Sequence, residues 1–102
     1  MVEIRWTVQA LDDVEAIACY IARDSSHYAQ LFAVKAFDAV QRLQAFPESG
    51  RTVPEINQPD IREIILGNYR IIYRLTNNLV EILTVFHSAR LLGIDFITSR
   101  ST

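Results

Sequence analysis

The stretch "IREIILGNYRIIYRLTNNLVEILTVFH", residues 61–87, decides the fold of this chain. Apolar residues alternate with other residues over three runs, and a period of two is typical of β-strands with two different faces. Gly67-Asn68 and Asn77-Asn78 interrupt the alternation, and both dipeptides favour two-residue hairpin turns. The stretch therefore predicts a three-stranded antiparallel meander over residues 61–88.

Two-residue turns also fix which residues of neighbouring strands face each other. Arg74 then lies opposite Glu81, and Arg70 lies opposite Val85 with His87 on its diagonal. One face of the meander is almost wholly apolar and is expected to meet helices; it comprises Ile64, Leu66, Tyr69, Ile71, Tyr73, Leu75, Val80, Ile82 and Phe86. The other face mixes charged and aliphatic residues; it comprises Ile61, Glu63, Ile65, Arg70, Ile72, Arg74, Glu81, Leu83, Val85 and His87.

Upstream of the meander, the apolar period changes from two to that of an α-helix. The alternation in residues 1–6 predicts a strand. Residues 7–46 are predicted to form a helical hairpin, with one helix over 8–23 and a second that ends near Phe46, before a proline. The polar side of the first helix, which carries Asp12, Asp13 and Glu15, is expected to face away from the core.

These elements together predict the fold class. A strand, two antiparallel helices and a three-stranded meander form an α+β domain with the helices on one face of the sheet. Residues 52–60 contain two prolines and are expected to be extended and irregular. The whole chain, 1–102, is expected to be one domain with a C-terminal tail at 89–102.

Arg70 is the residue of the meander that most needs a partner. Glu81 lies across from Arg74 and explains it as a cross-strand ion pair. Arg70 has an apolar neighbour instead, so we expect its guanidinium to serve an external contact, with an ion pair to Glu63 as the alternative. The aliphatic residues on the same face would be a poor solvent surface, so residues 52–60, the C-terminal "LLGIDFI" or a partner chain should cover them.

Composition excludes several classes of protein. The net charge of the 102 residues is −2, whereas a general nucleic-acid binder is clearly basic. No apolar run approaches the roughly 20 residues of a membrane helix, and the N-terminus lacks a secretory pattern. Cys19 is the only cysteine, so no intramolecular disulfide forms. We expect a cytoplasmic chain with no metal and no cofactor.

Four segments, in this order, resemble the ParE/RelE toxin superfamily of bacterial type II toxin–antitoxin systems. They are "YIARDSSHYAQLF", "LQAFPESGRTVPE", "REIILGNYRIIYR" and "VFHSARL", and the resemblance spans residues 3–92. The short "VFHSARL" ending and the "FPESGR" helix exit look more like the ParE branch. The resemblance implies the α+β fold described above and a cognate antitoxin, ParD-like with a ribbon–helix–helix N-terminus, that covers part of the toxin surface.

Two functions compete within the superfamily. ParE-like members resemble protein binders that poison DNA gyrase. For this chain we expect neither a membrane partner nor direct sequence-specific DNA binding. RelE-like members resemble ribosome-dependent mRNA endonucleases that need no metal. In the RelE pattern the positions matching Arg70 and Arg90 would bind phosphate, and His87 would be the candidate acid or base. The acidic balance of the chain disfavours an RNA-rich target, so gyrase inhibition is the first hypothesis.

The residues expected to contact the target or the antitoxin follow from these arguments. They comprise Arg62, Arg70, His87, Arg90, Ile65, Ile72, Leu83 and Val85. For four of them a role without an external contact is the open alternative: a hydrogen-bonded His87 at the end of its strand, an Arg70 paired with Glu63, an Arg62 that shares a face with Tyr73, and a surface Arg90.

Overall fold

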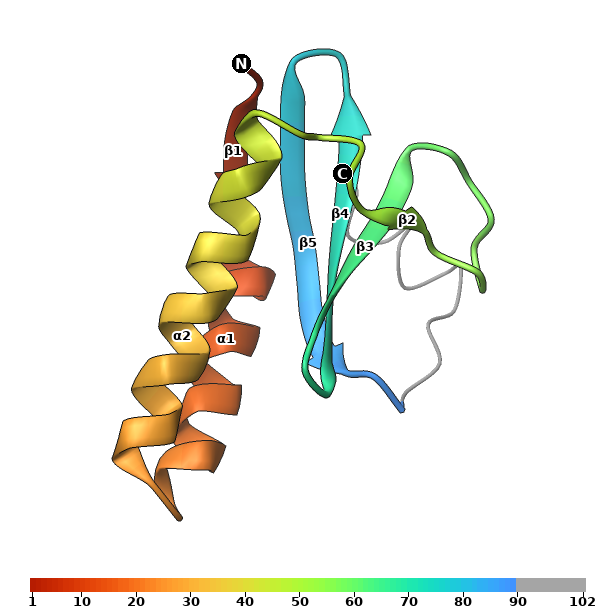
Figure 1. Cartoon of the computed structure of the whole chain (residues 1–102). Coiled ribbons are helices and arrows are strands. Elements are labelled where there is room, and N and C mark those ends of the chain that lie inside the picture. The colour runs from red at the N-terminus through yellow and green to blue at the C-terminus, as the bar shows by residue number, and fades with distance from the viewer. Residues whose placement is uncertain (90–102) are drawn as a thin grey trace.

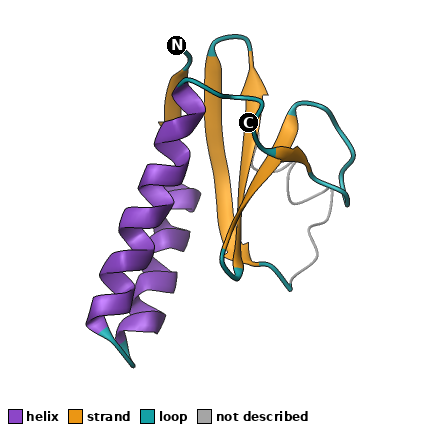
Figure 2. Cartoon of the chain, viewed as in Figure 1, coloured by secondary structure: helices purple, strands orange, loops and turns teal. Residues whose placement is uncertain are grey.

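The computed structural model describes residues 1–89 and shows a helical hairpin packed against one face of a five-stranded sheet (Figures 1 and 2). Strand β1, Glu3–Trp6, leads into helices α1, Val8–Ala22, and α2, Ser26–Gln41. The predicted α+β class, with a strand followed by two helices and then strands, is confirmed. No helix of residues 1–89 combines the length and apolar character that a membrane span requires.

Both helices begin at capping residues. The Thr7 hydroxyl accepts a hydrogen bond from the Ala10 amide at 3.1 Å, and the Ser25 hydroxyl accepts one from the Tyr28 amide at 3.2 Å. Each cap satisfies an amide that has no partner inside its helix. After α2 the chain tightens into a 3₁₀ turn over Arg42–Gln44, so the second helix ends before the predicted Phe46.

The remaining strands continue along the chain. They are β2, Arg51–Thr52; β3, Ile61–Leu66; β4, Tyr69–Thr76; and β5, Leu79–His87. The sheet order is β1-β5-β4-β3-β2, with β1 parallel to β5 and the other pairs antiparallel. Strand β1 thus forms one edge of the sheet, next to β5. At the other edge, the two-residue β2 covers only part of β3.

The predicted register is right for β3 and β4 but wrong for the second half of β5. Tyr73 pairs with Ile82 and Ile72 pairs with Thr84, so Leu83 is an extra residue in a β-bulge. Every later residue of β5 is shifted by one position. Phe86 therefore lies opposite Arg70, where the uninterrupted register had placed Val85.

The bulge exchanges the predicted faces of two apolar residues, Val85 and Phe86. Val85 belongs to the cluster between the sheet and the helices, which also contains Ala10, Val14, Phe32, Ala36, Val40, Leu43, Ile71, Tyr73, Val80 and Ile82. Phe86 belongs to a second cluster on the opposite face. The predicted register had placed these two residues the other way round.

The opposite face of the sheet is covered by residues 53–60, which we call the strap. Val53 and Ile56 of the strap pack with the aliphatic residues that were expected to need cover; the cluster also contains Ile61, Ile72, Leu83 and Phe86. Of the three possible covers, the structure shows the segment between β2 and β3 in this role.

Asp13 does not face away from the core as predicted. Its carboxylate accepts hydrogen bonds from the Thr84 hydroxyl at 2.5 Å and from the Val85 amide at 3.1 Å. β1 pairs with β5 only as far as Ile82, so the β5 edge is open beyond that point. Asp13, which lies on α1, thus provides the hydrogen-bond acceptor for these donors at the open edge, next to the bulge.

The turn between the helices and the sheet depends on a close approach at Gly50. The Tyr73 hydroxyl donates to the Pro47 carbonyl at 2.7 Å and accepts from the Gly50 amide at 3.0 Å. A Cβ at position 50 would lie 2.5 Å from the Tyr73 oxygen and 2.7 Å from the Glu63 carbonyl oxygen. Only glycine fits there without displacing buried atoms.

We expect Gly50→Ala to lower the free energy of unfolding by about 1–3 kcal/mol, because overpacking forces neighbouring atoms apart. Urea denaturation followed by circular dichroism measures the change. Gly67→Ala is the control without steric crowding, because no heavy atom lies within 4 Å of a Cβ there. Its cost in stability comes only from the backbone φ of +59°. A Gly50→Ala chain as stable as the wild type would contradict the close approach.

Candidate functional site

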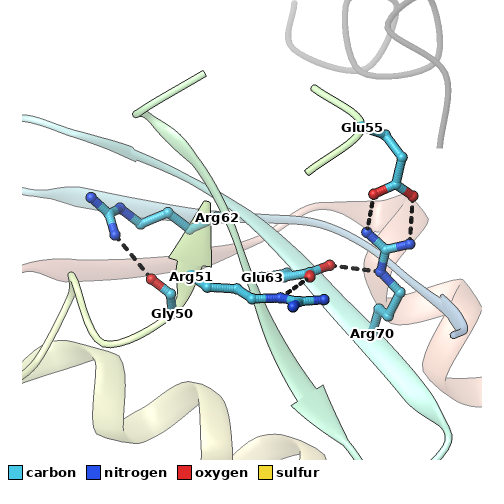
Figure 3. Close-up of polar contacts among 6 residues, drawn as sticks. All are labelled: Gly50, Arg51, Glu55, Arg62, Glu63 and Arg70. Carbon is cyan, nitrogen blue, oxygen red and sulfur yellow. Dashed lines mark hydrogen bonds and ion pairs between the residues drawn. The ribbon is translucent and has the colours of Figure 1, made fainter. Parts of the chain in front are cut away.

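Arg70 lies at the centre of a chain of charged side chains (Figure 3). Its Nε donates to the Glu63 carboxylate at 2.6 Å, and its two terminal nitrogens donate to the Glu55 carboxylate at 2.6 and 2.9 Å. Glu63 also accepts from Arg51 Nε at 2.5 Å. Two arginines and two carboxylates thus alternate across β2, β3, β4 and the strap.

The charged side chains at the centre of this arrangement are largely buried, so they need partners of opposite charge. The side chains of Arg70 and Glu63 are 6% and 0% exposed, and that of Glu55 is 20% exposed. The Arg70 guanidinium also lies over the Phe86 ring, with 5.2 Å between its central carbon and the ring centroid. The hydrogen bonds that Arg70 donates to Glu55 raise the pKa of Arg70 above its ordinary value, against the opposing effect of burial. Its charge is therefore retained inside the domain.

The structure shows the alternative prediction for Arg70, an ion pair to Glu63, and adds a second carboxylate partner, Glu55. Glu55 was not predicted as a partner of Arg70, because it lies in the strap, whose position no hairpin register fixes. A bidentate carboxylate occupies the side of the guanidinium that a phosphate or a partner protein would need. Arg70 is 5% exposed and holds the strap to the sheet.

His87 lies on the other face of the sheet from Arg70. The bulge at Leu83 pairs His87 with Tyr69, and the two rings are in edge contact with centroids 5.6 Å apart. Tyr69 in turn contacts Phe32 of α2, which identifies this as the helix side. His87 is exposed, and its Nδ1 accepts a hydrogen bond from the Ala89 amide at 3.1 Å. Arg70 and His87 therefore do not converge on one reacting atom, as a nuclease would require.

The other predicted contact residues divide by exposure. Ile72, Leu83 and Val85 are buried at 0 to 2% exposure, so they are core residues and do not form an external surface. Ile65 is 49% exposed and remains available to a partner. Arg90 lies outside the described residues.

Arg62 is half-buried and is held by backbone rather than by a carboxylate. One terminal nitrogen donates to the Gly50 carbonyl at 2.9 Å, and its Nε is buried without a hydrogen-bond partner (Figure 3). It belongs, as predicted, to the same β3–β4 pair as Tyr73. Arg62 is thus a cation without a carboxylate partner among residues 1–89.

Arg74 is structural, but its ion-pair partner differs from the predicted one. It lies opposite Glu81 as expected, yet its Nε is 3.8 Å from the Asp60 carboxylate of the strap. Both arginines of β4 therefore turn toward the strap. Within residues 1–89, no group of three or more His, Cys, Asp or Glu side chains is placed to hold a metal ion.

Comparison with known proteins identifies relatives that cover most of the chain. Residues 4–92 match the family described as the ParE toxin of the type II toxin–antitoxin system parDE. The toxin RelE2 of Caulobacter vibrioides is 35% identical over 92 residues, which cover 89% of this chain and 100% of that protein. The putative toxin Y4kP of Sinorhizobium fredii is 37% identical over 87 residues, which cover 83% and 86% of the two chains.

The fold is also found among solved structures. A chain of the chromosomal ParDE toxin–antitoxin system from P. aeruginosa superposes with a TM-score of 0.70 and covers 85% of this chain and 96% of its own length. The identity is 22%, so this similarity concerns the fold.

We expect Arg70→Met to lower the free energy of unfolding by about 3–5 kcal/mol, because it leaves the buried Glu63 and Glu55 carboxylates without their shared cation. Thermal and urea denaturation measure the loss. Since the pKa of Arg70 is raised, its contribution would disappear only as pH rises through that raised value, so the loss should be constant across the physiological range.

Arg62→Met is the matched control. It removes the same charge from the same sheet but breaks bonds to backbone carbonyls only, so we expect a cost of about 1 kcal/mol. Equal costs for the two variants would show that the carboxylate network adds nothing to stability.

Proposed function

Because the chain belongs to the ParE toxin family of type II toxin–antitoxin systems, we propose that it arrests bacterial growth by binding DNA gyrase. In this proposal the toxin acts through protein–protein contact in the cytoplasm and leaves broken DNA behind. A cognate antitoxin, ParD-like with a ribbon–helix–helix N-terminus, neutralises it. The toxin class follows from the family; the target and the antitoxin are the proposal.

One observation supports a binder over a nuclease. Metal-independent RNA cleavage needs cations on the phosphate and an acid or base within reach of the same atoms. Glu55 and Glu63 occupy the Arg70 guanidinium, and the bulge at Leu83 places His87 on the opposite face of the sheet. Within residues 1–89, the RelE pattern would use Arg70 and His87. These two residues lie on opposite faces of the sheet, and the charge of Arg70 is already neutralised by carboxylates.

A ribosome-dependent endonuclease is the second candidate. The relative from Caulobacter vibrioides is called toxin RelE2, and that name favours the RelE branch. The two candidates differ in their target, so one pair of assays separates them.

The purified chain should inhibit supercoiling of relaxed plasmid by gyrase and should accumulate cleaved DNA, while messages in a translating extract stay intact. His87→Ala, an exposed substitution, should keep both toxicity in cells and gyrase inhibition within about twofold of the wild type. The matched control is Ser88→Ala, its exposed neighbour. Cleavage of message that His87→Ala abolishes would establish the endonuclease instead.

A further inference from the structure

Strand β1 is an open edge of the sheet. It pairs with β5 on one side, and no strand of residues 1–89 lies along its other side. The Glu3 and Thr7 amides donate to carbonyls on the β5 side at 2.8 and 3.1 Å, so the odd-numbered residues direct their backbone groups toward β5. Ile4 and Trp6 therefore direct theirs outward. An edge of this kind can pair with another strand unless something covers it.

The open part of this edge is short and has a defined end. The Val2 amide, which points outward like that of Ile4, donates to the Gln44 carbonyl at 3.3 Å. Within residues 1–89, the amide and carbonyl of Ile4, the amide of Trp6 and the carbonyl of Val2 have no backbone partner. These four groups are the donors and acceptors that the edge offers to a further strand.

The exposed side chains of β1 carry one charge of each sign. Ile4 and Trp6 pack against the core on the helix side, so Glu3 and Arg5 point to the other face of the sheet. The ion pair between Glu3 and Arg5 is long, at 3.8 Å, and the two side chains are 68% and 57% exposed. Glu81 lies beside Arg5 in the register but forms no ion pair with it. Both charges of β1 therefore remain accessible to a partner.

The charge pattern of β1 is complementary to its own reverse. Residues 2–6 read "VEIRW", with an acid and a base placed symmetrically about Ile4. A two-fold axis through Ile4, perpendicular to the sheet, puts Glu3 opposite Arg5 of a second copy and Arg5 opposite Glu3 of that copy. A shift of the register by two residues in either direction puts like charges opposite each other, which is unfavourable. In the complementary register the charged residues form a non-hydrogen-bonded pair, where side chains lie closest.

An apolar patch lies next to this edge on the helix side. The Trp6 ring contacts the ring of Phe37, with centroids 4.8 Å apart, and Figure 1 shows β1 beside the C-terminal half of α2. Phe37 is 43% exposed, and Val34, which precedes it by one turn on the same helix face, is 55% exposed. The two-fold axis through Ile4 brings the patches of two copies to the same face of a joined sheet.

We propose that two copies of the chain pair their β1 strands antiparallel about Ile4, which joins two five-stranded sheets into one. The Ile4 amide and carbonyl of each copy bond to those of the other, and each Trp6 amide donates to the Val2 carbonyl of the other copy. Two ion pairs flank these bonds on one face, and the apolar patches flank them on the helix face. The contact is small, so the dimer is weak and forms as the protein concentration rises. It requires neither the proposed target nor the antitoxin.

Sedimentation equilibrium of the purified full-length chain, over a concentration series at low salt, tests the charge pairing. Arg5→Glu and Glu3→Arg should each raise the Kd of the dimer at least about tenfold, because like charges then face each other across the axis. The two substitutions in one chain recreate a complementary pattern and should restore the Kd to within about threefold of the wild type. The control is Arg23→Glu, at an exposed arginine after α1, which should change the Kd less than about twofold.

The backbone and apolar contacts have separate readouts. Hydrogen exchange of the Ile4 amide should be rapid in dilute solution and should slow as the dimer forms, whereas the Glu3 amide, bonded within the sheet, should not change with concentration. Val34→Asp should raise the Kd at least about fivefold, because it puts a charge into the apolar patch. Tyr20→Asp, at a residue 65% exposed on α1, is the control and should leave the Kd unchanged.

Three results would overturn the dimer. The first is a wild-type chain that stays monomeric at every concentration of the series. The second is a dimer that the single charge substitutions do not weaken, or that the double exchange does not restore. The third is an Ile4 amide that becomes protected only when the product of the neighbouring reading frame is added, which would assign the β1 edge to that partner.

Discussion

The structure depends on the guanidinium of Arg70 held between two carboxylates. Glu63 fixes its Nε and Glu55 its two terminal nitrogens, which ties the strap to the middle of the sheet. Burying charges costs free energy unless every group is paired, and here each charge has a partner of opposite sign. The strap can then cover Ile61, Ile72 and Leu83, so the second face of the sheet becomes core and not surface.

The local pattern predicted most of the fold, because turns and periods are local properties. The two-residue turn at Gly67-Asn68 fixed the β3–β4 register, and the helical period of the apolar residues over 7–46 indicated the hairpin. The bulge at Leu83 was missed because Leu83, Val85 and Phe86 are all apolar, so either register gives each face of the sheet an apolar residue. Because of this one extra residue, the prediction placed Val85, Phe86 and His87 on the wrong faces of the sheet.

The candidate site was harder to predict because it depends on contacts far apart in sequence. Glu55 is fifteen positions from Arg70 and lies in an irregular segment, so nothing in the alternation indicated their contact. Because Arg70 is paired internally, cations without an ion pair must be sought elsewhere among residues 1–89; Lys35 and Arg42 are two that are exposed.

The most direct test of the central claim is hydrogen exchange of the strap amides, residues 53–60, in the wild type and in Glu55→Gln. The substitution keeps the shape of the side chain and removes the charge that holds Arg70 to the strap. We predict exchange at least about tenfold faster in the strap, with the amides of the β4–β5 pair unchanged. Equal strap exchange in the two chains would contradict the claim that Arg70 fastens this segment.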